Sequence, residues 1–287
     1  MGESSIISLP TAGHRMERTM ESNVRVWIAT LHQSRERLLG LAGPLSPEQV
    51  AGPSYCRDWT IAQVLSHLGS GAEIATTLML PAALGQAEPP GPEAYQPIWD
   101  RWNAMSPDEQ AAAGLMSDAQ YVQALDGLSD DELASISYPF FNMTLDAVGI
   151  VRLRLGEHAL HTWDIAVALD PAAEVSADAV RLLIDNVPAF LAPRLGKPQD
   201  PPFRARIRTT GPARDYLLNA TADGVTMSDW AGAAEADAAG AEIADITMPA
   251  AALLRLSYGR LDTDHTPSAV IAKPGDLERL RAIFPGF

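Results

Sequence analysis

Residues 155–164 read Leu-Gly-Glu-His-Ala-Leu-His-Thr-Trp-Asp and predict the middle of one long helix. Glu157 and His161 are four residues apart, so they share one face of that helix. Leu153 and Ala168 extend the same face with apolar residues, and we therefore expect it to point into a helical bundle. A carboxylate and an imidazole are costly to bury unless something compensates them. A metal ion would compensate both.

A third ligand has to come from another helix, and His67 is the best candidate. It lies in the middle of a helix predicted over residues 60–80, and Gly71, one turn later, is expected to leave space beside it. Two histidines and one carboxylate match a catalytic zinc site with three protein ligands and an open fourth position. Bundle cores commonly hold such sites. We therefore predict one zinc ion (Zn2+) per chain on His67, Glu157 and His161.

Each part of this pattern also has an ordinary explanation. A Glu and a His four residues apart often form only a solvent-facing contact, and a lone histidine on an amphipathic helix is more often a satisfied core residue. The joint occurrence is what favours a metal. His158 points about 100° away from Glu157 around the helix, so we expect it at the surface or behind a ligand. His14, His32 and His265 have no partner on a helix face.

The bulk composition predicts a soluble globular protein and excludes several function classes. The chain has 287 residues, 47% of them hydrophobic, and a net charge of −15, which disfavours binding to nucleic acid or to anionic membranes. No apolar run approaches the roughly 18 residues of a membrane helix, and Met1–Gly13 does not resemble a signal peptide. The single cysteine, Cys56, permits no internal disulfide. We expect a cytoplasmic monomer or weak homodimer.

The order of the predicted elements indicates an α+β fold, with an N-terminal four-helix bundle and a small α/β C-terminal domain. Capping boxes at Ser46, Thr60, Ser106 and Ser129 mark helix starts. Helices are predicted near 17–41, 60–80, 107–126, 144–169 and, with a kink at Pro188, 177–195. Strands are predicted at 203–209, 216–220, 225–228, 242–248 and 268–273, and helices at 249–260 and 276–284.

The pattern changes near Gly196–Pro202, which predicts two domains, 15–196 and 197–287. Two segments carry no helix or strand pattern. The Pro-rich segment 86–97 is either a linker or a segment that lines a site, and the Ala-rich segment Ala231–Gly240 is expected to be a loop.

Three motifs resemble one known family. Residues 58–68 read Asp-Trp-Thr-Ile-Ala-Gln-Val-Leu-Ser-His-Leu and resemble the D-W-T-x-x-x-V-x-x-H-L signature of the mycothiol-dependent maleylpyruvate isomerase-like family, which is related to the DinB fold. Residues 157–164 resemble the family's E-x-x-x-H-x-W-D helix. Residues 256–260, Leu-Ser-Tyr-Gly-Arg, resemble its L-x-x-G-R element. The resemblance spans most of residues 17–284.

This resemblance implies a DinB-like bundle that binds zinc through the same three residues, followed by a domain like sterol carrier protein 2. It also implies mycothiol as a thiol cosubstrate and a small-molecule electrophile as its partner. A thiolate bound at the open zinc position would attack the electrophile. Elimination after bond rotation would make the enzyme a cis-trans isomerase, and release of the adduct would make it a thiol S-transferase. Residues 81–143 do not align with a known specificity, so the electrophile stays open.

Two further residues have candidate roles as catalytic groups, Arg260 and Asp164. Arg260 could hold a carboxylate of the substrate or the cosubstrate through two hydrogen bonds, or it could satisfy the last carbonyls of a helix. Asp164 could orient His161 or a neighbouring group as a hydrogen-bond acceptor, or it could be an ordinary surface acid. Trp59 is expected to be a packing residue, and Cys56 a structural one.

Two rival functions also fit the sequence. A zinc-activated water could hydrolyse an amide or an ester. Alternatively, the metal could be structural and the C-terminal domain could bind a small apolar ligand without catalysis. A fourth protein ligand would favour that alternative, and Cys56, in a loop before the helix that carries His67, is not an obvious one. A requirement for an added thiol discriminates the enzyme that uses mycothiol from the hydrolase.

Overall fold

The computed structural model describes residues 23–232 and 242–286 and shows a mixed fold of helices and one main sheet. The predicted α+β class is therefore confirmed. The chain divides into two compact units, the first ending at His158 and the second beginning at Ala159. This division falls inside α9 (Ala147–Leu169), which is a single continuous helix.

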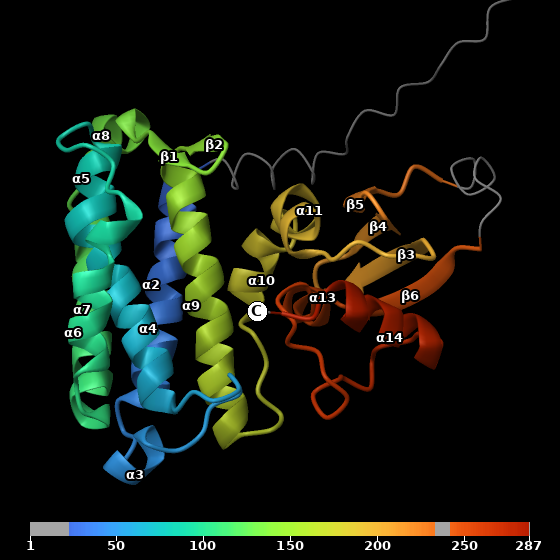
Figure 1. The fold of residues 1–287 in the computed structure, drawn as a ribbon, viewed down its shortest axis with the longest axis horizontal. Helices are drawn as coiled ribbons and strands as arrows, with labels where there is room; N and C mark the ends of the chain where they lie inside the picture. The colour runs from blue at the N-terminus through green and yellow to red at the C-terminus, as the bar shows by residue number, and fades with distance from the viewer. Residues whose placement is uncertain (1–22, 233–241, 287) are drawn as a thin grey trace, which may run out of the picture. The chain divides into compact units, whose positions relative to one another are not determined.

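Long helices form the first unit. They are α2 (Val24–Ala42), α4 (Ile61–Ile74), α7 (Pro107–Asp126) and the first part of α9, which run roughly parallel in Figure 1. Glycines allow α4 and α7 to approach closely, because a Cβ on Gly69 would lie only 2.6 Å from the Cα of Gly114. The four-helix bundle is the predicted one.

The predicted capping boxes are all present, at Ser46, Thr60, Ser106 and Ser129. The predicted helix over 60–80 is less regular than expected, because α4 continues as a π-helical turn, η1 (Ala75–Met79), and then as α5 (Leu80–Ala83). Pro81 explains the change, since proline has no N–H with which to continue the α-helical hydrogen bonds.

Shorter elements complete the first unit: α3 (Pro47–Val50), η2 (Pro92–Ala94), α6 (Gln96–Asn103), α8 (Asp130–Ser135), β1 (Tyr138–Phe140) and β2 (Met143–Leu145). The Pro-rich segment 86–97 contains η2 and the start of α6, so it is not a structureless linker. The antiparallel β1–β2 hairpin was not predicted. It explains why α9 begins at Ala147, after the strand, instead of at 144. Residues 17–22 of the first predicted helix lie outside the described residues.

The second unit is built on a four-stranded sheet of order β5-β4-β3-β6, in which only the β3–β6 pair is parallel. Its strands are β3 (Phe203–Thr210), β4 (Arg214–Thr221), β5 (Gly224–Asp229) and β6 (Ala244–Pro249). On β3, Phe203, Ala205 and Ile207 are buried, as the alternation of apolar and basic residues predicts. The predicted loop Ala231–Gly240 lies outside the described residues beyond Gly232.

Helices complete this unit: α10 (Ala177–Leu183), η3 (Val187–Leu191), α11 (Ala192–Leu195), α13 (Ala250–Ser257) and α14 (Pro274–Ile283). The helix predicted over 177–195 is interrupted after α10, and Pro188, where a kink was expected, lies near the start of the π-helical turn η3. The predicted strand at 268–273 is wrong, since only one isolated bridge joins Ile271 to Thr247. Pro267 and Pro274 flank that bridge, and proline cannot donate to a sheet ladder.

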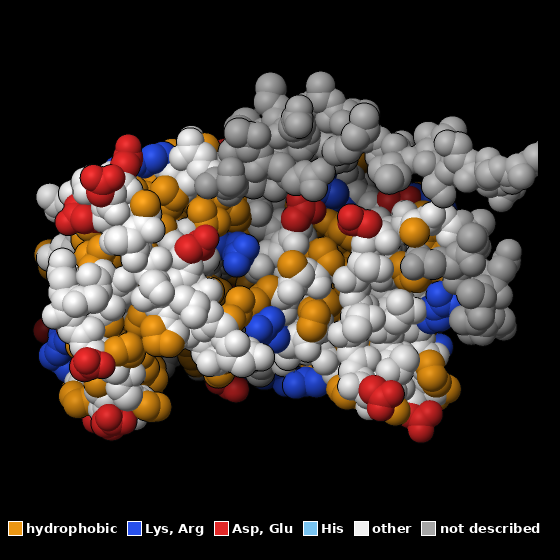
Figure 2. All heavy atoms as spheres, turned by 90° about the horizontal axis from the view of Figure 1, so that it is seen from above, with side chains coloured by type: hydrophobic (Ala, Val, Ile, Leu, Met, Phe, Trp, Pro, Cys, Tyr) orange, Lys and Arg blue, Asp and Glu red, His pale blue; other side chains and the backbone are white. Residues whose placement is uncertain are grey.

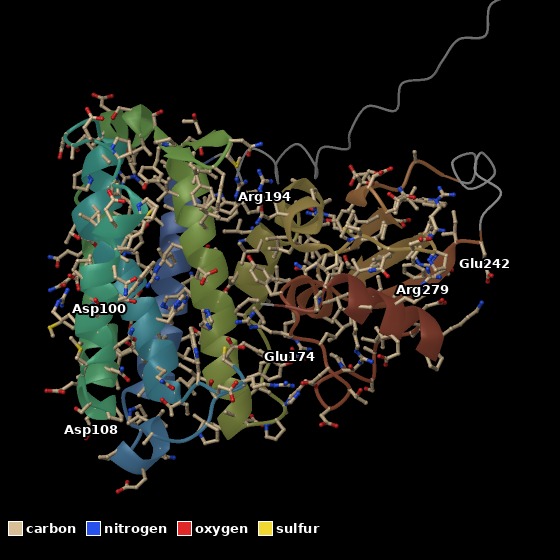
Figure 3. The ribbon with its side chains drawn as sticks, in the orientation of Figure 1. Asp100, Asp108, Glu174, Arg194, Glu242 and Arg279 are labelled. Atoms are coloured by element: carbon tan, nitrogen blue, oxygen red, sulfur yellow. The ribbon has the colours of Figure 1, made fainter. Side chains whose placement is uncertain are left out.

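The predicted domain boundary near Gly196–Pro202 stays a prediction. In the second unit, the backbone N–H of Lys197 donates to the carbonyl of Ile283, and Arg279, labelled in Figure 3, donates to the carbonyls of Pro201 and Pro202. These bonds tie residues 197–202 to the second unit.

Limited proteolysis can place the boundary. We expect a broad-specificity protease to cut first in the exposed loop 170–174, because exposed loops open locally at low cost. Terminal sequencing of the fragments would show this. A first cut within 197–202 would instead support the predicted boundary. A first cut inside α9 would contradict both the boundary at 170–174 and the predicted one.

Candidate metal centre

Two helices bring the predicted metal ligands together. His67 lies on α4 and Glu157 on α9, and the Nε2 atom of His67 is 3.1 Å from Oε2 of Glu157. Because α9 is continuous, His161 lies one helical turn beyond Glu157. Each of the three residues offers one ligand atom, and these atoms all lie within 4.8 Å of one another.

The ligand face is more open than the sequence predicts. The side chains of His67 and Glu157 are 41% and 46% exposed, whereas that of His161 is only 10% exposed. Ala168, expected to continue a buried face, is exposed. The prediction that both members of the helix pair are buried is therefore wrong for Glu157. The residues of α9 that fill the bundle core lie on its other faces. His67 and Glu157 are therefore both partly open to solvent.

Asp164 is not the surface acid that was one of its two predicted interpretations, because its side chain is fully buried. Its Oδ2 atom lies 2.8 Å from Nδ1 of His161. Burial raises the pKa of the Asp164 carboxyl, but hydrogen bonds from His161 and Arg260, together with the charge of Arg260, outweigh burial and hold the pKa at about 2. An ionised carboxylate only accepts, so Nδ1 of His161 carries the proton. This leaves Nε2 of His161 for a metal ion.

Arg260 grips Asp164 with two parallel hydrogen bonds, from Nε to Oδ1 at 2.8 Å and from Nη2 to Oδ2 at 2.7 Å. Its third nitrogen, Nη1, donates to the carbonyl of Tyr258 at 3.1 Å. Tyr258 directly follows the last residue of α13, so this bond resembles the predicted alternative in which Arg260 satisfies carbonyls at a helix end. All three guanidinium nitrogens therefore have a partner. Binding of a substrate or cosubstrate carboxylate by Arg260 stays a prediction.

The end of α13 explains how Arg260 reaches this position. The predicted helix over 249–260 stops at Ser257 because Gly259 has a positive φ of 73°. The N–H of Gly259 bonds the carbonyl of Leu256, and the N–H of Arg260 bonds that of Arg255. This is a Schellman turn. A Cβ on Gly259 would also clash with the backbone of Gly286, so glycine is required.

Other predictions around the site need correction. His158 is fully buried rather than at the surface, because it turns into the bundle, away from the ligand face. The space expected beside Gly71 is taken by Arg154, whose Nη1 would lie 3.3 Å from a Cβ there. His32 pairs with Asp126, and His265 with Asp262, so both are ordinary polar contacts. His14 lies outside the described residues.

Sequence reasoning undervalued two residues of the loop before α4. Trp59 is 38% exposed rather than packed away, and its ring centroid lies 5.4 Å from that of His67. Asp58 before it has a positive φ of 67°, a strained conformation for a residue with a side chain. Cys56 forms a second group of potential ligands with His161 and Asp164, again with atoms within 4.8 Å. The loop conformation that produces both placements leaves no pattern in the sequence.

The donor set fits a divalent metal ion. Two imidazoles and one carboxylate are ligands that zinc prefers in catalytic sites. A histidine ligand usually donates its other ring N–H to a carboxylate or a carbonyl, and His161 has this arrangement with Asp164. The same donors also suit other divalent transition metals.

No helix among the described residues is long and apolar enough to cross a membrane. On the face in Figure 2, acidic side chains are scattered among apolar and uncharged ones, and the basic side chains of the described residues form no continuous patch. This agrees with the net charge of −15.

Comparisons with known proteins give a family match over part of the chain and a fold. Residues 31–166 match the family described as the mycothiol maleylpyruvate isomerase N-terminal domain. The solved mycothiol-dependent maleylpyruvate isomerase is similar with a TM-score of 0.64 and 14% identity, over 88% of this chain and 94% of that chain. A histidine-to-alanine mutant of that isomerase gives 0.61 and 14%, over 83% and 90%. No curated protein sequence matches the chain. At this identity the structural likeness concerns the fold.

Proposed function

We propose that this chain, whose residues 31–166 match the mycothiol maleylpyruvate isomerase N-terminal domain, is a metal-dependent enzyme that uses mycothiol. His67, Glu157 and His161 would hold one zinc ion. The observation that carries this proposal is the meeting of two imidazoles and a carboxylate within 4.8 Å, on a face where two of them are exposed.

The residues around the ligands have separate tasks. Asp164 accepts a hydrogen bond from the Nδ1–H of His161 and so would hold the imidazole with Nε2 turned toward the ion. Arg260 keeps Asp164 charged and in place. Trp59, half-exposed beside His67, offers an apolar wall to an arriving substrate. A bound zinc ion would stabilise the thiolate form of mycothiol and so make its sulfur a better nucleophile.

The chemistry that fits these tasks is addition of the thiol to an electrophilic carbon. In a conjugated cis alkene, sulfur bonds to one carbon and a proton is taken up at another, which leaves a single bond that can rotate. Loss of the same thiol then returns the trans alkene. Release of the adduct instead gives thiol S-transfer.

The thiol requirement tests this proposal. We expect the metal-loaded protein to turn over a conjugated electrophile only when mycothiol is added, with a rate that saturates in mycothiol. Product formation can be followed with a panel of electrophiles, with and without the thiol. Full turnover of an ester or an amide without any thiol would favour the hydrolase. No turnover at all, with an apolar ligand held by residues 197–287, would favour the binding protein.

A further inference from the structure

A polar network is buried in the bundle behind the ligand face. Asp118 on α7 accepts a hydrogen bond from Nη2 of Arg154 at 2.7 Å and lies 2.9 Å from Nε2 of His158. The other ring nitrogen of His158 is 2.8 Å from the hydroxyl oxygen of Ser34 on α2. We call these four residues the buried network. A serine, a histidine and an aspartate in a row resemble a hydrolytic triad, but Ser34 is only 2% exposed and His158 is 0% exposed, so no substrate reaches them.

The network is attached to both helix turns that carry metal ligands. Nη2 of Arg154 also donates to the carbonyl of Leu68 at 2.9 Å, and Leu68 directly follows His67 on α4. His158 directly follows Glu157 on α9. One guanidinium nitrogen therefore joins α7, α9 and the His67 turn of α4.

A neighbouring bond reinforces this attachment. The hydroxyl of Ser117, on α7 beside Asp118, donates to the carbonyl of Gly69 at 2.8 Å. Two successive carbonyls of α4, just after His67, are thus held by polar side chains. Such bonds to single carbonyl oxygens define how far one helix may slide along another, which apolar contacts do only loosely.

Stability alone does not explain this arrangement. Charged groups lose hydration when they are buried, and well-packed apolar residues often replace a buried ion pair with no loss of stability. The charge of Asp118 is nevertheless strongly favoured, because His158 and Arg154 overcome the effect of burial and hold its pKa far below the ordinary range. A role in fixing the register of the helices explains why these charged groups are buried despite the hydration that they lose.

We propose that Asp118 is a positioning residue, which acts with Arg154 to fix α4 against α9 and so sets the distance between His67 and Glu157. Only the metal that these two residues would hold rests on the proposed function. The positioning itself concerns the two helices, on which Nε2 of His67 lies 3.1 Å from Oε2 of Glu157.

The variant that tests this is Asp118→Asn combined with Arg154→Met. Asparagine still accepts a hydrogen bond from His158, and methionine removes the charge that Asp118→Asn alone would leave buried and unpaired. The link to the Leu68 carbonyl is lost. The matched control is Asp126→Asn, on the same helix α7 and also paired with a histidine, His32, but with a side chain that is 47% exposed.

Two measurements are made on each protein. In metal-free protein we expect the double variant to shift and broaden the imidazole NMR signals of His67, while its unfolding stays cooperative. In a titration with Co2+, we expect its affinity to fall about tenfold or more. The Asp126→Asn control is expected to match wild type in both.

Wild-type His67 signals and wild-type Co2+ affinity in a folded double variant would overturn the proposal. If the double variant does not fold, Arg154→Lys keeps a positive charge beside Asp118 but removes the guanidinium that joins Asp118 to the Leu68 carbonyl, and unchanged His67 signals there would also overturn the proposal. If wild type binds no Co2+ while the His67 signals respond to the double substitution, the proposed metal function fails and the positioning role stands.

Discussion

Replacing His161 with alanine is expected to remove nearly all metal binding. His161 is the least exposed of the three proposed ligands, and its ring is already held by Asp164. Loss of a residue that merely supports a ligand commonly lowers metal affinity by about 10–100-fold, and loss of the ligand itself should cost more. Isothermal titration of metal-free protein with Zn2+ would measure the change.

His32→Ala is the matched control for this substitution. His32 lies on α2 and is 40% exposed. It pairs with Asp126, which is not one of the proposed metal ligands. We expect this variant to bind metal as wild type does. Equal zinc affinity in wild type and in His161→Ala would remove His161 from the site.

Arg260→Met is expected to destabilise the fold and to weaken metal binding together. The substitution leaves the fully buried carboxylate of Asp164 with one partner fewer. Removing one member of a buried ion pair typically costs about 3–5 kcal/mol. Asp164 would then hold His161 less firmly, so zinc affinity should fall by about 10–100-fold. Urea unfolding and zinc titration measure the two effects.

The control for this variant is Arg208→Met on β3. Arg208 also pairs with an aspartate, Asp245, but the two side chains are 39% and 60% exposed. An exposed pair contributes about 0–1 kcal/mol. A stability loss for Arg260→Met no larger than that for Arg208→Met would show that the Asp164 pair is not important for the fold.

The pair of Asp164 and Arg260 also predicts how the stability of the fold depends on pH. The pKa of Asp164 is lowered from 3.8 to about 2, so its contribution to stability is fully present above 3.8 and is lost as the pH falls toward 2. Without Arg260 the effect of burial gains weight and the pKa of Asp164 rises. We therefore expect Arg260→Met to lose stability at a higher pH than wild type when urea unfolding is repeated from pH 6 downward. If the stability of both proteins falls over the same pH range, this expectation is contradicted.

Local patterns predicted the parts of the site that depend on one helix. The spacing of Glu157 and His161 places both on one face, and the capping box at Thr60 defines the start of the helix that carries His67. Each of these features involves residues within four positions of one another, and helix geometry alone determines the outcome.

Features that depend on distant residues were not predictable in the same way. Arg260 meets Asp164 across 96 positions of sequence, and His158 meets Asp118 across 40. No local pattern specifies such pairs, because they depend on the register of packed elements. The exposure of Glu157 was missed for the same reason, since Leu153 and Ala168 are apolar although the face that they share with Glu157 is partly open to solvent.

We propose that His67, Glu157 and His161 together hold one metal ion. The most direct measurement is the metal content of wild type, His67→Ala and Glu157→Gln after dialysis against a small excess of Zn2+, by mass spectrometry of the metal and quantification of the protein. We predict about one zinc per chain in wild type and a strong loss in both variants. Wild-type protein without bound zinc, or variants that retain as much as wild type, would contradict the claim.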